Sequence, residues 1–150
     1  MTSIKPTIVI VHGAWSDSSP FAAVDSLLAA DGYTVAHFAN PLRSLDADTD
    51  YLAAFLETRT AGPVVLVGHS YGGAVIGGAA LSEPAGEQAW KTLPSWYVAG
   101  TEDHSIDIDT QRFMAERAGS TLTEVKAGHL AMVAEPGTVT RIIEDAAAAK

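Results

Sequence analysis

The stretch at residues 63–81 constrains the fold of this chain more than any other. It begins with a short apolar run, Val64 to Val67, which is typical of a strand buried on both faces. The next five residues, 68–72, match the pattern G-x-S-x-G, and a helical run of small residues follows. This order of strand, tight turn and helix predicts a strained backbone at Ser70 and a hydroxyl group that stands clear of the sheet.

The pattern around Ser70 has two simpler explanations, a Gly-rich strand-to-helix turn and a phosphate-binding loop. The strand before it and the helix after it favour a third, in which Ser70 is a nucleophile. Gly68 and Gly72 flank the serine because a side chain at either position would collide with the neighbouring strand or helix. The free N–H groups at the start of the helix would face any negative charge that develops beside Ser70.

Apolar runs and turn residues divide the rest of the chain into alternating strands and helices. Pro20, Pro136 and an acidic residue at Asp109 indicate helix starts, and Gly32 and Gly119 indicate helix ends. We expect Asp46, Asp48 and Asp50 to cap a helix over 45–60 and to complement its dipole rather than to bind a metal. The expected strands lie at residues 7–11, 33–38, 64–67, 95–99 and 121–125.

This alternation predicts an α/β protein, a three-layer sandwich with a mainly parallel sheet of about five strands. With right-handed crossovers, the simplest strand order is 2-1-3-4-5. The order reverses between strands 1 and 3, and ligands bind outside the carboxyl ends of the strands at such a point. The loop at residues 12–15 and the turn that carries Ser70 both fall there.

Composition excludes several classes of protein. The net charge of −9 disfavours nucleic acid and an anionic membrane as partners. The chain has no cysteine, so disulfides, thiolate chemistry and Cys-based zinc sites are excluded. With no signal-peptide pattern and no apolar run long enough to span a bilayer, we expect a single cytoplasmic domain over residues 1–150 that uses neither a cofactor nor a metal.

A serine nucleophile needs a base to take its proton, and the base is usually a histidine. His129 follows the fifth strand at the carboxyl edge of the sheet, where a base could reach over it. For His12 and His69, which lie in tight turns, packing or a local hydrogen bond is the simpler explanation. His37 lies within a strand, and His104 directly follows a candidate acid.

The acid that orients the histidine should lie at the end of the fourth strand. Asp103 is the preferred candidate, and Glu102 and Asp107 are its rivals, each of which could instead be a solvated loop charge or a helix cap. The resulting order, Ser70, Asp103, His129, is nucleophile, acid, base. The backbone N–H groups of Tyr71 and Ala14 would complete the site by holding the oxyanion.

These motifs together resemble the α/β-hydrolase superfamily, in particular its small esterase and hydroxynitrile-lyase-like branch. The matching segments are 9–15, 66–73, 94–103 and 128–129. The resemblance implies a serine hydrolase of small carboxylic esters that works through an acyl-enzyme intermediate. It also implies a substrate pocket near His12, Trp15, His69 and Leu130.

Two positions separate hydrolases from lyases in that branch. Lyase members tend to carry threonine in the slot of Gly13 and lysine directly after the catalytic histidine, where this chain has Leu130. A lyase needs that cation for the departing cyanide, so its absence favours ester hydrolysis.

The chain departs from its longer relatives at residues 82–94, a short connection where they carry a strand and a helical cap. Strand 4 could then pair directly with strand 3, about 4.8 Å closer than in those relatives. Alternatively the slot stays open, and the exposed sheet edge invites a partner chain such as a second copy. Without a cap we expect a shallow, wet pocket of weak selectivity.

Two alternative hypotheses place the chain in other classes of protein. The short connection could leave a catalytically silent or small-molecule-binding α/β scaffold. The predicted strand order is also that of a flavodoxin-like domain, although the Ser, Asp and His pattern would then be a coincidence.

Overall fold

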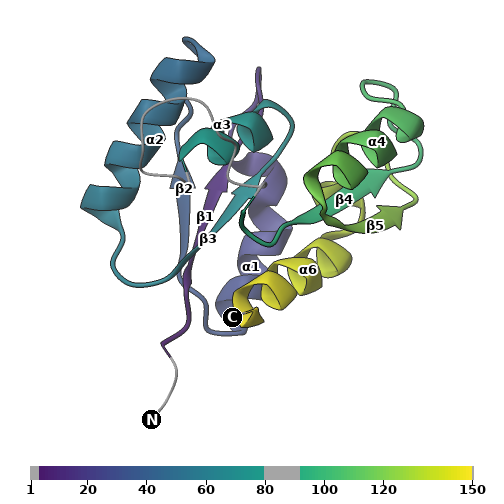
Figure 1. Ribbon diagram of the computed structural model, residues 1–150. Coiled ribbons are helices and arrows are strands. Elements are labelled where there is room, and N and C mark those ends of the chain that lie inside the picture. Colours follow the sequence, from purple (N-terminus) through teal and green to yellow (C-terminus); the bar gives the residue numbers. More distant parts are fainter. Residues whose placement is uncertain (1–3, 80–91, 150) are drawn as a thin grey trace. The chain divides into compact units, whose positions relative to one another are not determined.

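The computed structural model describes residues 4–79 and 92–149, which form two compact units (Figure 1). Among the described residues, the first unit comprises 4–19 and 28–79, and the second comprises 20–27 and 92–149. The division of the chain falls within two helices, η1 (Ser19–Phe21) and α1 (Ala22–Ala30).

The first unit is built on a parallel sheet in the order β2-β1-β3. Val11 at the end of β1 pairs with Phe38 on one side and with Gly68 on the other, so the three carboxyl ends lie at one edge. Both the order and the aligned edge confirm the prediction for these strands. The strands are β1 (Thr7–Val11), β2 (Val35–Phe38) and β3 (Val64–Gly68).

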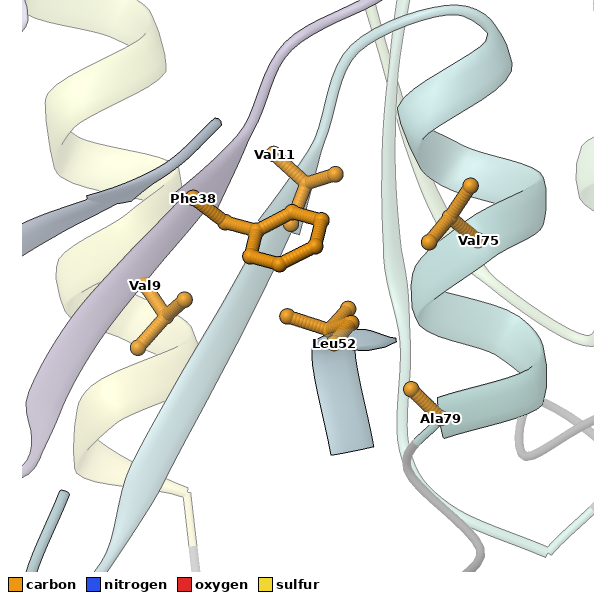
Figure 2. Close-up of a cluster of buried hydrophobic side chains, with 6 residues drawn as sticks. All are labelled: Val9, Val11, Phe38, Leu52, Val75 and Ala79. Carbon is orange, nitrogen blue, oxygen red and sulfur yellow. The ribbon is translucent and has the colours of Figure 1, made fainter. Parts of the chain in front are cut away.

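Two helices of this unit, α2 (Leu45–Arg59) and α3 (Tyr71–Ala79), pack against each other. Alternate residues of a strand face the same side, and Val9 and Val11 therefore share one face of β1. That face carries the apolar core shown in Figure 2. Strand β1 is buried on both faces, as its continuous apolar run predicts. The buried cluster consists of Val9, Val11, Phe38, Leu52, Val75 and Ala79.

The second unit contains a parallel pair, β4 (Trp96–Gly100) and β5 (Thr121–Val125). Helix α4 (Ile108–Ala118) packs on both strands, and α5 (Ala131–Ala134) and α6 (Pro136–Ala148) contact β4. Thus the α/β class and the parallel pairing are confirmed. The five strands among the described residues are divided over a three-stranded and a two-stranded sheet.

The connection predicted at residues 82–94 falls mostly outside the described residues. The single domain over residues 1–150 stays a prediction.

The caps of two helices differ from the prediction. Asp107 rather than Asp109 caps α4, because its backbone is extended and its carboxylate accepts a hydrogen bond from the Thr110 N–H at 2.9 Å. Ser44 caps α2 in the same way, accepting from the Ala47 N–H at 3.2 Å. Asp48 is therefore available for a different role, described below.

Candidate active site

Ser70 lies on a sharp turn between β3 and α3 and has a left-handed backbone with φ of 54°. A non-glycine residue in this region costs about 1–3 kcal/mol and persists only where its surroundings impose it. A side chain on Gly72 would lie 2.2 Å from the Val11 carbonyl oxygen, and one on Gly68 would lie 2.7 Å from the Gly72 backbone. The turn is therefore packed too tightly for side chains on either side of Ser70, as the sequence predicts.

The loop after β1 lies against this turn. A side chain on Gly13 would be 3.1 Å from both the Ser70 Cβ and the His69 carbonyl oxygen. Trp15, two residues later, also has a left-handed backbone, with φ of 51°. Both loops that the topology predicts at the switch point therefore meet at the carboxyl edge of the first sheet.

His12 is buried and has both ring nitrogens in hydrogen bonds. Its Nδ1 lies 2.8 Å from the Gly13 carbonyl oxygen, and its Nε2 accepts from the Asn40 N–H at 3.0 Å. The acceptor role of Nε2 places the proton on Nδ1, which then donates to Gly13. These bonds tie the loop after β1 to the end of β2, and the predicted pocket role of His12 stays a prediction.

A cavity of about 340 Å³ opens beside these loops in the first unit. It brings together Ala14 and Tyr71, the two predicted oxyanion donors, and Trp15, which is 99% exposed. His12 and His69 are not among its lining residues. The full lining is Ala14, Trp15, Leu42, Arg43, Ser44, Leu45 and Tyr71.

Asp48, which the sequence predicts as a helix cap, instead contacts a residue of the candidate site. Its carboxylate is fully buried and accepts a hydrogen bond from the Tyr71 hydroxyl group at 2.6 Å. This bond, together with burial and the nearby negative charge, raises the pKa of Tyr71 to about 12. The signal was present in the sequence, because Asp48 precedes the buried Leu52 by one helical turn and so shares its face.

In the second unit, the His129 Nδ1 lies 2.7 Å from Asp103 Oδ2. The Asp103 side chain is 5% exposed and that of His129 is 29% exposed. Because an ionised carboxylate can only accept, the proton lies on Nδ1, and Nε2 is the nitrogen that can take a further proton.

Backbone N–H groups hold Asp103 in its charged form. Its Oδ1 accepts from the Ser105 N–H at 2.7 Å and from the Ile106 N–H at 3.0 Å. Burial by itself would raise the pKa of Asp103, but the bonds from Ile106, His129 and Ser105 together keep it below its usual value.

Close packing of the two loops brings Asp103 and His129 together. A side chain on Gly100 would lie 2.5 Å from the Ala127 carbonyl oxygen. The Glu102 N–H donates to that same oxygen at 3.0 Å, so the loop after β4 rests on the loop after β5.

The rival candidates in this unit have other roles. Glu102 forms an exposed ion pair with Lys126 at 3.8 Å, and Asp107 caps α4. His104 is exposed, and Leu130, predicted for the pocket, is 43% exposed.

The predicted site residues therefore form two local groups. Ser70, Tyr71 and Ala14 belong to the first unit, and Asp103 and His129 belong to the second.

Within the part of the chain that the structure describes, no cluster of His, Asp and Glu residues could hold a metal ion. No described helix is long and apolar enough to cross a membrane.

Comparison with known proteins identifies the class to which this fold and these motifs belong. The family model described as the alpha/beta hydrolase family matches residues 8–86, which is more than half of the chain. This chain belongs to that family. No curated protein matches the sequence.

Several solved structures share the fold. A pyrethroid hydrolase from Sphingobium faniae JZ-2 superposes with a TM-score of 0.76 at 17% identity, covering 96% of this chain and 98% of that one. A protein described as a hydrolase of the alpha/beta superfamily, from Xanthomonas campestris pv. campestris, gives 0.73 at 19%, covering 94% and 97%. A thioesterase domain from the curacin biosynthetic pathway gives 0.75 at 12%, covering 93% and 91%. At these identities the likeness establishes the fold alone.

Proposed function

We propose that this member of the alpha/beta hydrolase family is a serine hydrolase of small carboxylic esters. Ser70 Oγ attacks the ester carbonyl carbon while His129 Nε2 takes its proton, and Asp103 holds the imidazole in the required tautomer. Collapse of the tetrahedral intermediate expels the alcohol, which leaves with that proton. Water then hydrolyses the acyl-enzyme by the same steps and regenerates Ser70.

The strained backbone of Ser70 carries this proposal. A φ of 54° at a serine between two glycines that cannot hold a side chain is a costly arrangement. Nothing in a plain strand-to-helix turn requires it, whereas a nucleophile needs its hydroxyl group raised above the sheet.

Three other features support the proposal. The 2.7 Å distance between His129 Nδ1 and Asp103 Oδ2, with the proton on Nδ1, is that of a carboxylate that orients a catalytic base. Ala14 and Tyr71 line one cavity next to the Ser70 turn, as two oxyanion donors should. Hydrolases, among them a thioesterase domain, share the fold. The substrate would be a small molecule, and a cytoplasmic location stays part of the proposal.

Intact-mass labelling with a fluorophosphonate tests the nucleophile without requiring the right substrate. We expect one adduct on the parent and none on Ser70→Ala. An unlabelled parent would contradict the proposal and favour the catalytically silent scaffold.

Hydrolysis of short p-nitrophenyl esters tests the rest of the triad. We expect His129→Ala and Asp103→Asn to lower kcat by roughly 10³–10⁶-fold, in the range found for triad residues. His104→Ala and Glu102→Gln are the matched controls, since each removes a neighbouring group of the same type. The base and acid would have to be reassigned if a control lost as much activity as its partner variant.

A further inference from the structure

The Asp48 carboxylate joins two parts of the cavity wall. It accepts from the Tyr71 hydroxyl group at 2.6 Å and, through its other oxygen, from the Arg43 backbone N–H at 3.2 Å. Tyr71 follows Ser70 directly, and both Tyr71 and Arg43 line the 340 Å³ cavity. A fully buried carboxylate therefore connects the start of α3 with the segment that precedes α2.

The segment before α2 is under backbone strain at Leu42, whose φ is 57°. For a leucine this conformation is unfavourable, so the residues around it must hold it in place. The bond from the Arg43 N–H to Asp48 fixes the next residue along, and the Asp48 N–H donates to the Ser44 carbonyl oxygen at 2.9 Å. Asp48 thus holds the segment from both its side chain and its backbone.

All three non-glycine residues with left-handed backbones in the described ranges belong to this region. Trp15 and Leu42 line the cavity, and Ser70 precedes its lining residue Tyr71. Strained residues cluster where function fixes the geometry. The side chain that restrains two of these segments at once is then a candidate for shaping the site.

We propose that Asp48 is a positioning residue, which holds the Leu42–Arg43 wall and the Tyr71 ring in place so that the cavity can bind the substrate. This inference rests on the proposed ester hydrolysis. It adds a residue that touches no reacting atom and acts on substrate binding through its two hydrogen bonds.

The test compares Asp48→Ala with the parent in hydrolysis of p-nitrophenyl butyrate. We expect KM to rise about tenfold, because misplaced binding groups weaken substrate positioning, while kcat changes less than about threefold. Asp46→Ala is the matched control, since it removes an exposed carboxylate from the same helix. An unchanged KM in Asp48→Ala, or an equal rise in Asp46→Ala, would overturn the inference.

Two further variants separate hydrogen bonding from charge and from general loss of structure. In Asp48→Asn, the amide can accept from the Arg43 N–H and donate to the Tyr71 oxygen, so we expect KM within about threefold of the parent. Tyr71→Phe removes one hydroxyl group and should raise KM in the same direction as Asp48→Ala. A high KM in Asp48→Asn, or an unchanged one in Tyr71→Phe, would contradict positioning by these bonds.

Amide hydrogen exchange keeps this inference separable from the proposed function. If the parent shows no Ser70-dependent turnover, ester hydrolysis has failed, and exchange at the Arg43 N–H still reports on Asp48. We expect exchange at that amide at least about tenfold faster in Asp48→Ala than in the parent or in Asp46→Ala, since its acceptor is gone. Equal exchange in all three proteins would show that Asp48 does not hold this wall.

Discussion

At the scale of single residues, adjacent glycines in the Ser70 turn face very different surroundings. A Cβ atom on Gly72 would lie 2.2 Å from the Val11 carbonyl oxygen, whereas one on Gly73 would meet nothing within 4 Å. Gly72 thus allows α3 to begin directly against the end of β1. Gly73 has no such constraint, so the pair gives a matched test of close packing.

We expect Gly72→Ala to lower the free energy of unfolding by about 2 kcal/mol or more, because the backbone of β1 or α3 must move to admit the methyl group. Gly73→Ala should instead raise it by about 0.5–1 kcal/mol, since alanine loses less entropy than glycine in a helix. Urea denaturation of the two variants measures both effects. Equal stability of the two variants would show that the turn is looser than described.

At the scale of elements, the cap of helix α4 is Asp107, whereas the sequence pattern predicts Asp109, two residues later. Asp107 accepts from both the backbone N–H and the hydroxyl group of Thr110, whereas Asp109 pairs with the exposed Arg112 at 3.0 Å. Either aspartate is an acceptable cap by composition. The choice depends on which residue leaves the helical backbone, and Asp107 does, with φ of −61° and ψ of 156°.

Asp107→Ala should therefore lower the melting temperature by about 2–4 °C, the usual effect of losing an N-cap in a protein of this length. Asp109→Ala removes an exposed ion pair and should change it by much less. Thermal denaturation followed by circular dichroism compares the two. A larger decrease of the melting temperature in Asp109→Ala than in Asp107→Ala would show that Asp109 is the N-cap.

At the scale of the whole molecule, several carboxylates have a lowered pKa for local reasons. Hydrogen bonds from Ser19 lower the pKa of Asp17, and those from Thr110 lower the pKa of Asp107. The bond from Arg112 lowers the pKa of Glu124. At Asp103, burial opposes the bonds from Ile106, His129 and Ser105, but the bonds prevail.

These shifts predict loss of stability in acid. A carboxylate with a lower pKa in the folded state binds fewer protons than in the unfolded state, so it stabilises the fold above its unfolded pKa. That stability is lost as the pH falls through the folded pKa, which lies below the usual value of an aspartate for Asp17, Asp103 and Asp107. We expect the melting temperature to fall steeply between about pH 5 and pH 2.

Asp103→Asn tests the contribution of the buried carboxylate, since its melting temperature should depend less on pH over this range. Asp46→Asn, which changes an exposed aspartate, is the control. An identical slope in Asp103→Asn and the parent would show that Asp103 does not take part in the acid transition.

Two parts of the candidate site have a local geometry that the sequence predicts. The turn at Ser70 needs glycines on either side, and the pair of Asp103 and His129 sits in loops that directly follow predicted strands. Asp48 was misassigned because a cluster of aspartates at a helix start usually caps it. Its spacing from Leu52 places it on the buried face of α2, but its hydrogen-bond partner Tyr71 lies 23 residues away in the chain, and no local pattern identifies that partner.

Sequence patterns alone predict the α/β class, the order of strands within each sheet, the carboxyl edge of the first sheet where two candidate site loops meet, and the family. These follow from hydrophobic periodicity and turn chemistry, which act over a few residues. Tertiary contacts determine the division of the five described strands into two sheets, the left-handed backbone at Leu42 and the hydrogen bond between Tyr71 and Asp48. Each of these depends on contacts between segments far apart in the chain, whose energies the local pattern does not contain.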